Sequence, residues 1–278
     1  MAKGQGLIGN FKGKLGNTVG YSLKDSNNKQ TQGIRVYQPV VRNPKTYAQA
    51  EQRCKLAPIN ATYRALKMVI DRGQEGKAYG NKSRLAWLKD ALKEFDGPYF
   101  EKGLSITMPV LCTISKGSLA QPFPFAVGDD VLVIALNEGA GAGINTVGAL
   151  STAIIAKYPS IQNGDQITAV YVGSQANTLA GDALSIVMDT TSTAALPSFI
   201  SKEEDNFEFT SGLDYKYACC FIISREGDNG AHLRSNSVLN KTSDYDNDKL
   251  TEAAKQAAIE SYMSQGANTD WAEESIMG

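Results

Sequence analysis

The spacing of apolar residues changes at Pro98, and this change constrains the fold more than any other feature of the sequence. Between Pro44 and Pro98 apolar side chains recur at helical intervals, whereas the residues after Pro98 form short apolar or alternating runs separated by turn residues. Apolar residues that alternate along a strand lie on one face of a sheet. In a helix the same residues would lie on several sides, and some of them would face solvent. The sequence therefore predicts an α+β fold, with helices first and antiparallel strands after them.

The runs that follow Pro98 are typical of short β-strands. Turn residues lie between them, for example at 163–165 and at 226–230, and the second of these segments indicates a hairpin. Strands bounded in this way predict an antiparallel β-sandwich or barrel over residues 99–242. The expected strands are 105–114, 131–136, 153–158, 166–172, 183–189, 207–210, 217–224 and 232–239.

Residues 34–98 are expected to form a strand followed by a basic helical unit. Asn43 is suited to cap the first helix and Pro44 fits its first position. Pro58 should kink this helix or begin a new one at Ala57. The expected apolar faces consist of Ile59, Tyr63, Leu66 and Ile70, and then of Leu85, Leu88, Leu92 and Phe95.

The two ends of the chain differ from its middle in composition. Residues 1–33 are rich in Gly, Lys and Asn, which predicts a hairpin arm that becomes ordered against a partner. Residues 243–278 should form a helix, capped by Asp248 and with Ala254, Ala257 and other apolar residues on one side, and then an acidic tail. Trp271 is a large apolar residue in this polar tail, so we expect a pocket for it on this chain or on a neighbour.

Charge is divided along the chain although the net charge is only −1. Residues 1–93 contain 18 Lys and Arg against 5 Asp and Glu, a balance of +13, and residues 94–278 contain 10 against 24, a balance of −14. This asymmetry indicates that the basic part meets an anionic surface, either nucleic acid or the acidic part of another copy. Unlike patches that dock head to tail close into a ring when the rotation permits. Pairing of the two charges inside one monomer is the remaining alternative.

Residue types that carry catalysis or bind metal ions are scarce. His232 is the only histidine, no G-x-S-x-G motif occurs, and the four cysteines lack metal-ligand spacing. Asp244, Asp246 and Asp248 are similar to the start of a calcium loop, but Lys249 stands where that loop needs Gly. We expect His232 to be a sheet residue and the cysteines to be buried apolar residues. The sequence predicts no enzymatic activity, no cofactor and no metal site.

One glycine-rich loop keeps an enzymatic alternative open. Gly139, Gly141 and Gly143 follow a predicted strand, and backbone N–H groups in such a loop can approach a phosphate. The loop lacks the third glycine of the dinucleotide fingerprint, and no GK[ST] motif follows. We expect a flexible loop between two strands, with nucleotide binding as the alternative.

Two segments of the chain resemble a known domain family. GNTVGYSLKD and RVYQPVVRNPKTYAQAEQR resemble the opening of a domain family of unknown function that is common in Bacteroidetes and in their phages, and FIISREGDNGAHLRSNSVL resembles its closing hairpin. In length and composition the chain is similar to a virion protein of a crAss-like phage. The residues that carry the resemblance are Asn43, Pro44, Thr46, Ala48, Gln49 and Arg53, and then Ser224, Arg225, Leu233, Arg234 and Ser235.

This resemblance implies a structural role in the virion of a tailed bacteriophage, as a ring, collar or other tail component near the portal. The implied partners are other copies in a homo-oligomeric ring, and virion proteins such as the portal or neighbouring tail rings. We expect no membrane partner, because no apolar run is long enough to span a bilayer, and we expect assembly in the host cytoplasm. The alternative is a non-specific DNA-binding or genome-packaged protein, either cargo or auxiliary capsid. The expected contact residues are Lys12, Lys14, Tyr21, Arg35, Tyr37, Arg42, Lys45, Arg53 and Trp271.

Overall fold

The computed structural model describes residues 13–24, 30–37, 46–121, 131–176, 178–227, 230 and 232–264. The chain divides into two compact units, Met1–Lys45 and Thr46–Gly278. Helices and antiparallel strands are both abundant, which confirms the predicted α+β class. None of the sheets formed by the described residues closes into a barrel, so of the two expected architectures, sandwich or barrel, the barrel is excluded for these residues.

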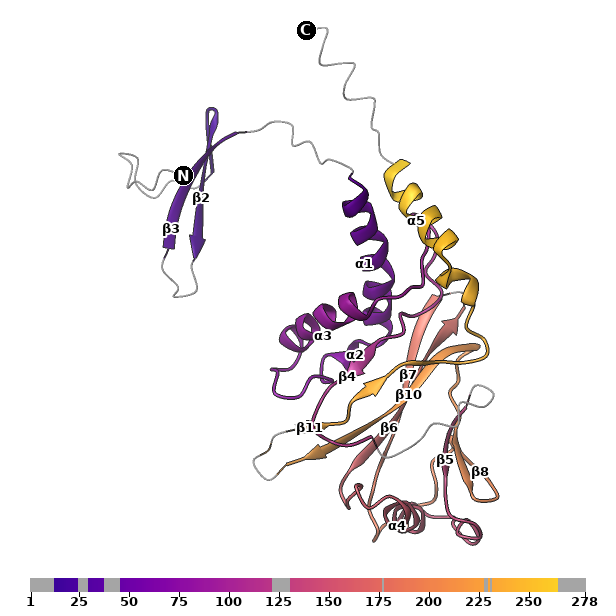
Figure 1. The fold of residues 1–278 in the computed structure, drawn as a ribbon. Coiled ribbons are helices and arrows are strands. Elements are labelled where there is room, and N and C mark those ends of the chain that lie inside the picture. The colour runs from indigo at the N-terminus through magenta and orange to yellow at the C-terminus, as the bar shows by residue number, and fades with distance from the viewer. Residues whose placement is uncertain are drawn as a thin grey trace. The chain divides into compact units, whose positions relative to one another are not determined.

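The first unit contains an antiparallel three-stranded sheet in the order β1-β2-β3 (Figure 1). Its strands are β1 (Gly13–Leu15), β2 (Thr18–Lys24) and β3 (Gln30–Val36). Gly16, in the turn between β1 and β2, has a φ of 57°, a conformation that glycine adopts without strain. The strand that we expected from Ile34 onward begins earlier, at Gln30, and belongs to the hairpin sheet as β3. The expected strand residues after Tyr37 lie outside the described residues.

The second unit begins with helices α1 (Tyr47–Ala65), α2 (Lys67–Ile70) and α3 (Asn81–Glu94). Thr46 caps α1, because its hydroxyl accepts a hydrogen bond from Gln49 N at 3.3 Å. The expected cap residues Asn43 and Pro44 lie outside the described residues. Helix α1 continues through Pro58, so no new helix begins at Ala57.

Apolar periodicity locates the buried face of the first helices correctly but not that of α3. Ile59, Leu66 and Ile70 are fully buried, as the spacing predicted. In α3 the prediction is partly wrong: Leu85 is 54% exposed, and Trp87 and Ala91 are the buried apolar residues. The indole of Trp87 fills more of the space beneath the helix than a leucine could, so it sets the rotation of α3 about its axis.

The second unit is built around an antiparallel sheet in the order β11-β10-β6-β7, with β13 (Asn240–Lys241) also paired to β10. Its strands are β6 (Gln166–Gln175), β7 (Thr178–Val187), β10 (Tyr215–Glu226) and β11 (His232–Arg234). Successive residues of a strand point to opposite faces, so the apolar run in β10 contributes to two cores. Cys219 packs in the core on one face and Cys220 in the core on the other.

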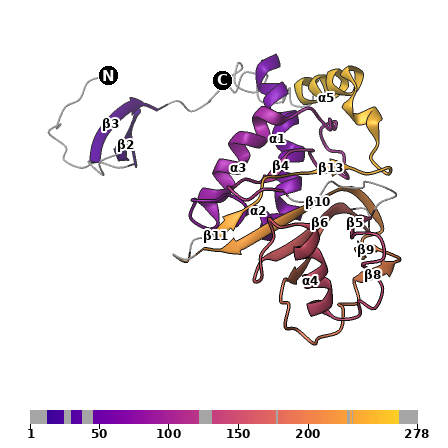
Figure 2. The same cartoon turned by 60° about the horizontal axis from the view of Figure 1, so that its bottom comes forward.

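Helices α1 to α3 cover one face of this sheet, and a second sheet with α4 covers the other (Figures 1 and 2). The second sheet has the order β5-β9-β8, with β5 (Leu132–Ala135), β8 (Ile200–Glu203) and β9 (Asn206–Phe209). Trp87 and Val170 share one core, and Phe207 and Tyr171 share the other. The basic helices and the β region therefore belong to one compact unit.

The expected strand at 153–158 is wrong, because these residues end a helix. Helix α4 (Val147–Lys157) starts after Thr146, whose hydroxyl accepts a hydrogen bond from Ala149 N at 3.3 Å. Leu150 and Ile154, one helical turn apart, are fully buried. This helical spacing outweighs the β-branched pair at Ile154 and Ile155.

Two other strand expectations hold only in part. Of the expected strand at 105–114 only its end is extended, in β4 (Thr113–Ser115), which pairs with β12 (Ser237–Val238). The expected strand at 232–239 is divided between β11 and β12, and Ser235 lies between them. The backbone turns away from β10 after Ser235, whose N–H donates to Ile223 O at 2.9 Å.

Helix α5 (Glu252–Ser264) ends the described part of the chain and packs on α1. A 3-10 turn at Asn247–Leu250 precedes it and contains Asp248, so Asp248 does not cap α5 as expected. Thr251 takes that role, because its hydroxyl accepts a hydrogen bond from Ala254 N at 3.2 Å. Ala258 and Ile259 are the fully buried residues of α5. Ala257, expected on the apolar side, is exposed.

Candidate functional site

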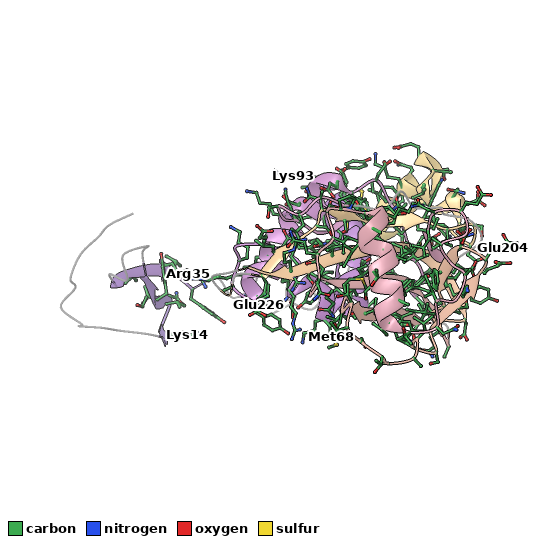
Figure 3. All side chains as sticks on the ribbon, turned by 90° about the horizontal axis from the view of Figure 1, so that it is seen from below. Lys14, Arg35, Met68, Lys93, Glu204 and Glu226 are labelled. Carbon is green, nitrogen blue, oxygen red and sulfur yellow. The ribbon has the colours of Figure 1, made fainter. Side chains whose placement is uncertain are left out.

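The hairpin sheet brings together on one face the expected contact residues Lys14, Tyr21, Arg35 and Tyr37. In the observed register Val19 lies opposite both Lys14 and Arg35, and Tyr21 lies opposite Gly33. Directly opposed residues of antiparallel strands point to the same face. The ammonium of Lys14 lies 3.8 Å from the centre of the Tyr37 ring, and Lys14 and Arg35 project from the hairpin in Figure 3. The face is therefore basic and aromatic.

The other face of the hairpin sheet exposes apolar side chains. Ile34 is 62% exposed and Val36 is 74% exposed, and they lie opposite Gly20 and Thr18, which are too small to cover them. Exposed apolar side chains on one face of a small sheet gain free energy when another surface covers them. The hairpin unit is thus suited to bind a partner through either face.

The remaining expected contact residues are distributed differently. Arg53 lies in α1, in the second unit, and is half-buried beside Cys54. Lys12, Arg42, Lys45 and Trp271 lie outside the described residues. The structure therefore groups four of the predicted residues on one surface and places Arg53 on another unit.

The helices of the second unit have the expected basic exterior. Of the basic residues in α1 to α3, the structure gives a carboxylate partner only to Lys55, whose ammonium is 2.8 Å from Glu51 within the described residues. The exposed basic side chains on these helices are Arg64, Lys67, Lys82, Lys89 and Lys93. They make no described ion pair, so they contribute an uncompensated positive surface.

The glycine loop that suggested nucleotide binding is occupied by a carboxylate of the chain itself. The N–H groups of Gly139 and Gly141 donate to the two carboxylate oxygens of Asp205 at 2.8 and 2.7 Å. These hydrogen bonds lower the pKa of Asp205. A Cβ on Gly141 would lie 2.2 Å from Glu204 O, so the loop packs directly on the turn between β8 and β9.

The surroundings of this glycine loop differ from the expectation in one respect. The loop joins β5 to helix α4, and not to another strand as we expected. The first turn of α4 is already capped by Thr146. Because Asp205 accepts the glycine N–H groups and Thr146 caps the helix, the loop offers a phosphate no free donors at Gly139 or Gly141.

The other residues considered for chemistry have structural roles. All four cysteines are buried free thiols, and burial raises the pKa of the Cys112 thiol to about 12. His232 is exposed in β11 opposite Glu226, as expected for a sheet residue. The described residues contain no group of three or more His, Cys, Asp or Glu side chains that could hold a metal ion. Among the same residues no helix is long and apolar enough to cross a membrane.

A groove that the sequence did not predict runs between the helices and the edge of the central sheet. It consists of two cavities of about 430 and 940 Å³ that share Arg72, Gln166 and Arg234. Met68, Tyr79 and Val187 line it and are 79%, 64% and 53% exposed, and Met68 is labelled in Figure 3. The groove therefore has arginines at its centre and apolar side chains along its rim. We name it the arginine groove.

Two arginines on the β10–β11 hairpin differ in how their charge is balanced. Arg225 makes a two-pronged contact with the buried carboxylate of Asp165, in which both nitrogen–oxygen distances are 2.7 Å. This contact raises the pKa of Arg225. The Nε of Arg234, by contrast, is buried and has no hydrogen-bond partner among the described residues. The sequence alone does not distinguish these two arginines. Each is a polar residue in a strand, and the strand pattern does not show which of them has an acidic partner.

Comparison with known proteins found no match for this chain: no family model, no curated protein and no solved structure is similar to it at a significant level.

Proposed function

We propose that this chain is a structural protein of a tailed-phage virion, most simply a ring, collar or other tail component that assembles by subunit contacts near the portal. The phage class rests on the resemblance of the opening and closing segments to the Bacteroidetes and phage domain family. The mode of action rests on the surfaces of the chain. The observation that carries the proposal is the hairpin unit, which has a basic and aromatic face and an exposed apolar face.

Charge supports assembly through contacts between unlike surfaces. The basic excess of residues 1–93 extends over both the hairpin and the exterior of α1 to α3, whereas the acidic excess follows residue 93. Complementary potentials steer encounter and set the register of docked subunits more than they add affinity. The exposed Ile34 and Val36 would then supply the apolar contact area.

The described residues also favour binding over catalysis. Asp205 occupies the N–H groups of the glycine loop, the cysteine thiols are buried, and the single histidine lies on an exposed strand. The groups that the sequence offered for chemistry therefore have structural roles in the described part of the chain.

The test is the mass of the recombinant protein over a wide range of concentrations, together with mass spectrometry of purified phage particles. We expect a discrete oligomer whose population increases with concentration, and peptides of this chain in the particles. A chain that is monomeric at every concentration and absent from particles would contradict the proposal.

A second candidate function, non-specific binding of DNA, is favoured by the basic and aromatic face of the hairpin. Phosphate contacts from Lys14 and Arg35 would make the affinity fall steeply with salt, and Tyr21 and Tyr37 could stack on bases. The variant Lys14→Glu with Arg35→Glu should then lose binding to single- and double-stranded DNA. The matched control is Lys89→Glu with Lys93→Glu, which makes the same charge change on α3. Equal loss in both variants would show that the hairpin face has no particular role.

A further inference from the structure

The arginine groove contains a positive charge that the described residues do not balance. Arg234 ends β11 and its Nε is buried without a hydrogen-bond partner, and Arg72 follows α2 and lines the same two cavities. No described carboxylate lies within ion-pair distance of either guanidinium. Burial, with a contribution from the charge of Arg72, lowers the pKa of Arg234. Two guanidinium groups that line the same cavities repel each other, and an anion bound between them would offset this repulsion.

Three of the four carboxylates that line the groove are engaged elsewhere, and the fourth, that of Glu226, ends β10 opposite His232. Asp71 accepts from the Tyr63 hydroxyl at 2.9 Å, and Asp182 accepts from the Ser211 hydroxyl at 2.8 Å. Glu75 accepts from the N–H and hydroxyl of Ser118, both at 2.8 Å, and from the backbone N–H of Arg234 at 3.0 Å. These contacts hold three of the acids against neutral donors, and no described ion pair joins any of the four to Arg72 or Arg234. An anion from outside the groove would therefore suit the two arginines.

The rim of the groove indicates what kind of molecule carries that anion. Met68, Tyr79 and Val187 are largely exposed around the arginines, and Arg72 is 5.0 Å from the centre of the Tyr79 ring. A free inorganic anion would use none of this apolar surface. A peptide with acidic side chains next to an aromatic residue would use both the arginines and the rim.

Such a peptide occurs in this chain, in the segment 265–278. Asp270, Glu273 and Glu274 surround Trp271, and the segment has no lysine, arginine or histidine. We propose that the arginine groove binds the acidic segment 265–278 of a second copy of this chain, with its carboxylates on Arg72 and Arg234 and Trp271 on the apolar rim. This inference rests on the proposed assembly function and names the contact that would join neighbouring copies.

Chain length limits how the segment of the same copy could reach the groove. Helix α5, which precedes the segment, packs beside Ala50 and Cys54 at the start of α1, whereas the groove lies at the other end of α1 and at α2 (Figure 1). The 19 residues of α1 span about 28 Å. Residues 265–270 reach at most about 20 Å when fully extended. The backbone of Asp270 in the same copy therefore falls short of Arg72, whereas Glu274, at up to about 33 Å, can span this distance. We place the segment of a second copy in the groove because that contact is the one that the proposed assembly function requires.

The proposal can be tested with the full chain and a labelled peptide of residues 265–278. The receptor is the variant Asp270→Asn, Glu273→Gln, Glu274→Gln, whose own segment should no longer compete. We expect this receptor to bind the peptide, and Arg234→Met in the same receptor to weaken binding by roughly tenfold or more. Arg64→Ala, which removes an exposed arginine from α1, is the matched control and should bind as the parent does.

Thermal unfolding separates a binding role for Arg234 from a structural one. Without peptide, Arg234→Met removes a buried charge that lacks a partner, so its melting temperature should equal or exceed that of the parent. A large decrease would show that Arg234 serves folding and would overturn the inference. Equal peptide affinity in the Arg234→Met receptor would also overturn it, as would stabilisation by inorganic phosphate that the peptide does not displace. If the wild type forms an oligomer and Arg234→Met does not change it, this inference is excluded and the proposed function is not. If the wild type is strictly monomeric, the proposed function is excluded.

Discussion

The hairpin sheet and the central sheet are both antiparallel, yet they bury very different fractions of their side chains. In β6 the adjacent residues Val170 and Tyr171 point to opposite faces, and both are fully buried. In β3 Ile34 and Val36 remain mostly exposed. Burial of apolar area contributes about 25 cal/mol per Å² wherever it occurs. The central sheet gains this free energy on folding, and the hairpin sheet gains it when another surface covers Ile34 and Val36.

Polar groups of the two regions differ in the same way. The Tyr171 hydroxyl donates to Phe209 O and accepts from Leu132 N, and it joins the central sheet to the second one. Lys14 and Arg35 of the hairpin make no described ion pair, and Lys14 lies only over the ring of Tyr37. We therefore expect substitutions in the second unit to change stability and substitutions in the hairpin to change association.

The largest effect on stability is expected for Phe209→Ala. Phe209 is fully buried between the two sheets, with its ring 5.4 Å from that of Phe221 in an edge-to-face contact. Its truncation leaves a cavity and should lower the free energy of unfolding by about 3–5 kcal/mol. Fluorescence of buried Trp87 during urea unfolding, in a Trp271→Phe background, reports on the second unit. A loss no greater than that of Val36→Ala in the hairpin would contradict the comparison.

The variant Asp165→Asn should have the next largest effect. Asp165 is fully buried and balances Arg225, so its neutralisation leaves that guanidinium largely buried without a counter-charge. We expect a loss of about 3 kcal/mol in the free energy of unfolding. Lys116→Met, which breaks the exposed pair with Asp90, is the control and should cost at most about 1 kcal/mol. Similar losses in both variants would show that burial of the pair does not matter.

Alkaline pH should destabilise the second unit through Cys112. Burial, with a contribution from Glu94, raises the pKa of this thiol to about 12, whereas a thiol in an unfolded chain ionises near pH 8.5. The contribution of the protonated thiol to stability is therefore complete below about pH 8.5 and is lost as the pH rises toward 12. At pH 10 this loss amounts to about 2 kcal/mol. Urea unfolding measures the free energy of unfolding of wild type and of Cys112→Ala. Between neutral pH and pH 10 the difference between them should shift by that amount in favour of the variant, and a difference that does not depend on pH would contradict this prediction.

The smallest effect on folding is expected for Ile34→Ser with Val36→Ser. Both side chains are exposed, so the unfolding of the second unit, followed by Trp87, should change by less than about 0.5 kcal/mol. The same variant should weaken self-association, because it removes the apolar face of the hairpin. Light scattering over a dilution series measures this, with Thr18→Ser on the same face as the control. Unchanged association would exclude the apolar face as the contact.

Prediction from the sequence succeeded where a short periodic pattern decides the outcome. The spacing of Ile59, Leu66 and Ile70 defined a buried helical face, and the apolar run at 217–224 predicted the strand that the structure shows as β10. It failed at α4, where the β-branched residues concealed the helical spacing of Leu150 and Ile154 after the Thr146 cap. It also failed at α3, where the volume of Trp87 determined which face packs against the sheet.

The candidate site was predictable only for the hairpin. Alternation within one short sheet places Lys14, Tyr21, Arg35 and Tyr37 together, because the register between neighbouring strands follows from short turns. The arginine groove had no such signal. Arg72 follows a helix and Arg234 ends a strand far along the chain, and only the packing of helices on the sheet brings them to one cavity.

The sequence by itself determined the division of charge, the α+β class and the scarcity of catalytic groups, because composition and local periodicity are sufficient for these. The tertiary structure decided which charges are balanced. Asp205 accepts hydrogen bonds from the N–H groups of a glycine loop that lies 64 to 66 positions earlier in the sequence. Asp165 balances the charge of Arg225, whereas Arg234 has no acidic partner among the described residues. The reason is that an ion pair forms between groups that are close in space, and contacts between distant segments arise only when the sheets and helices pack.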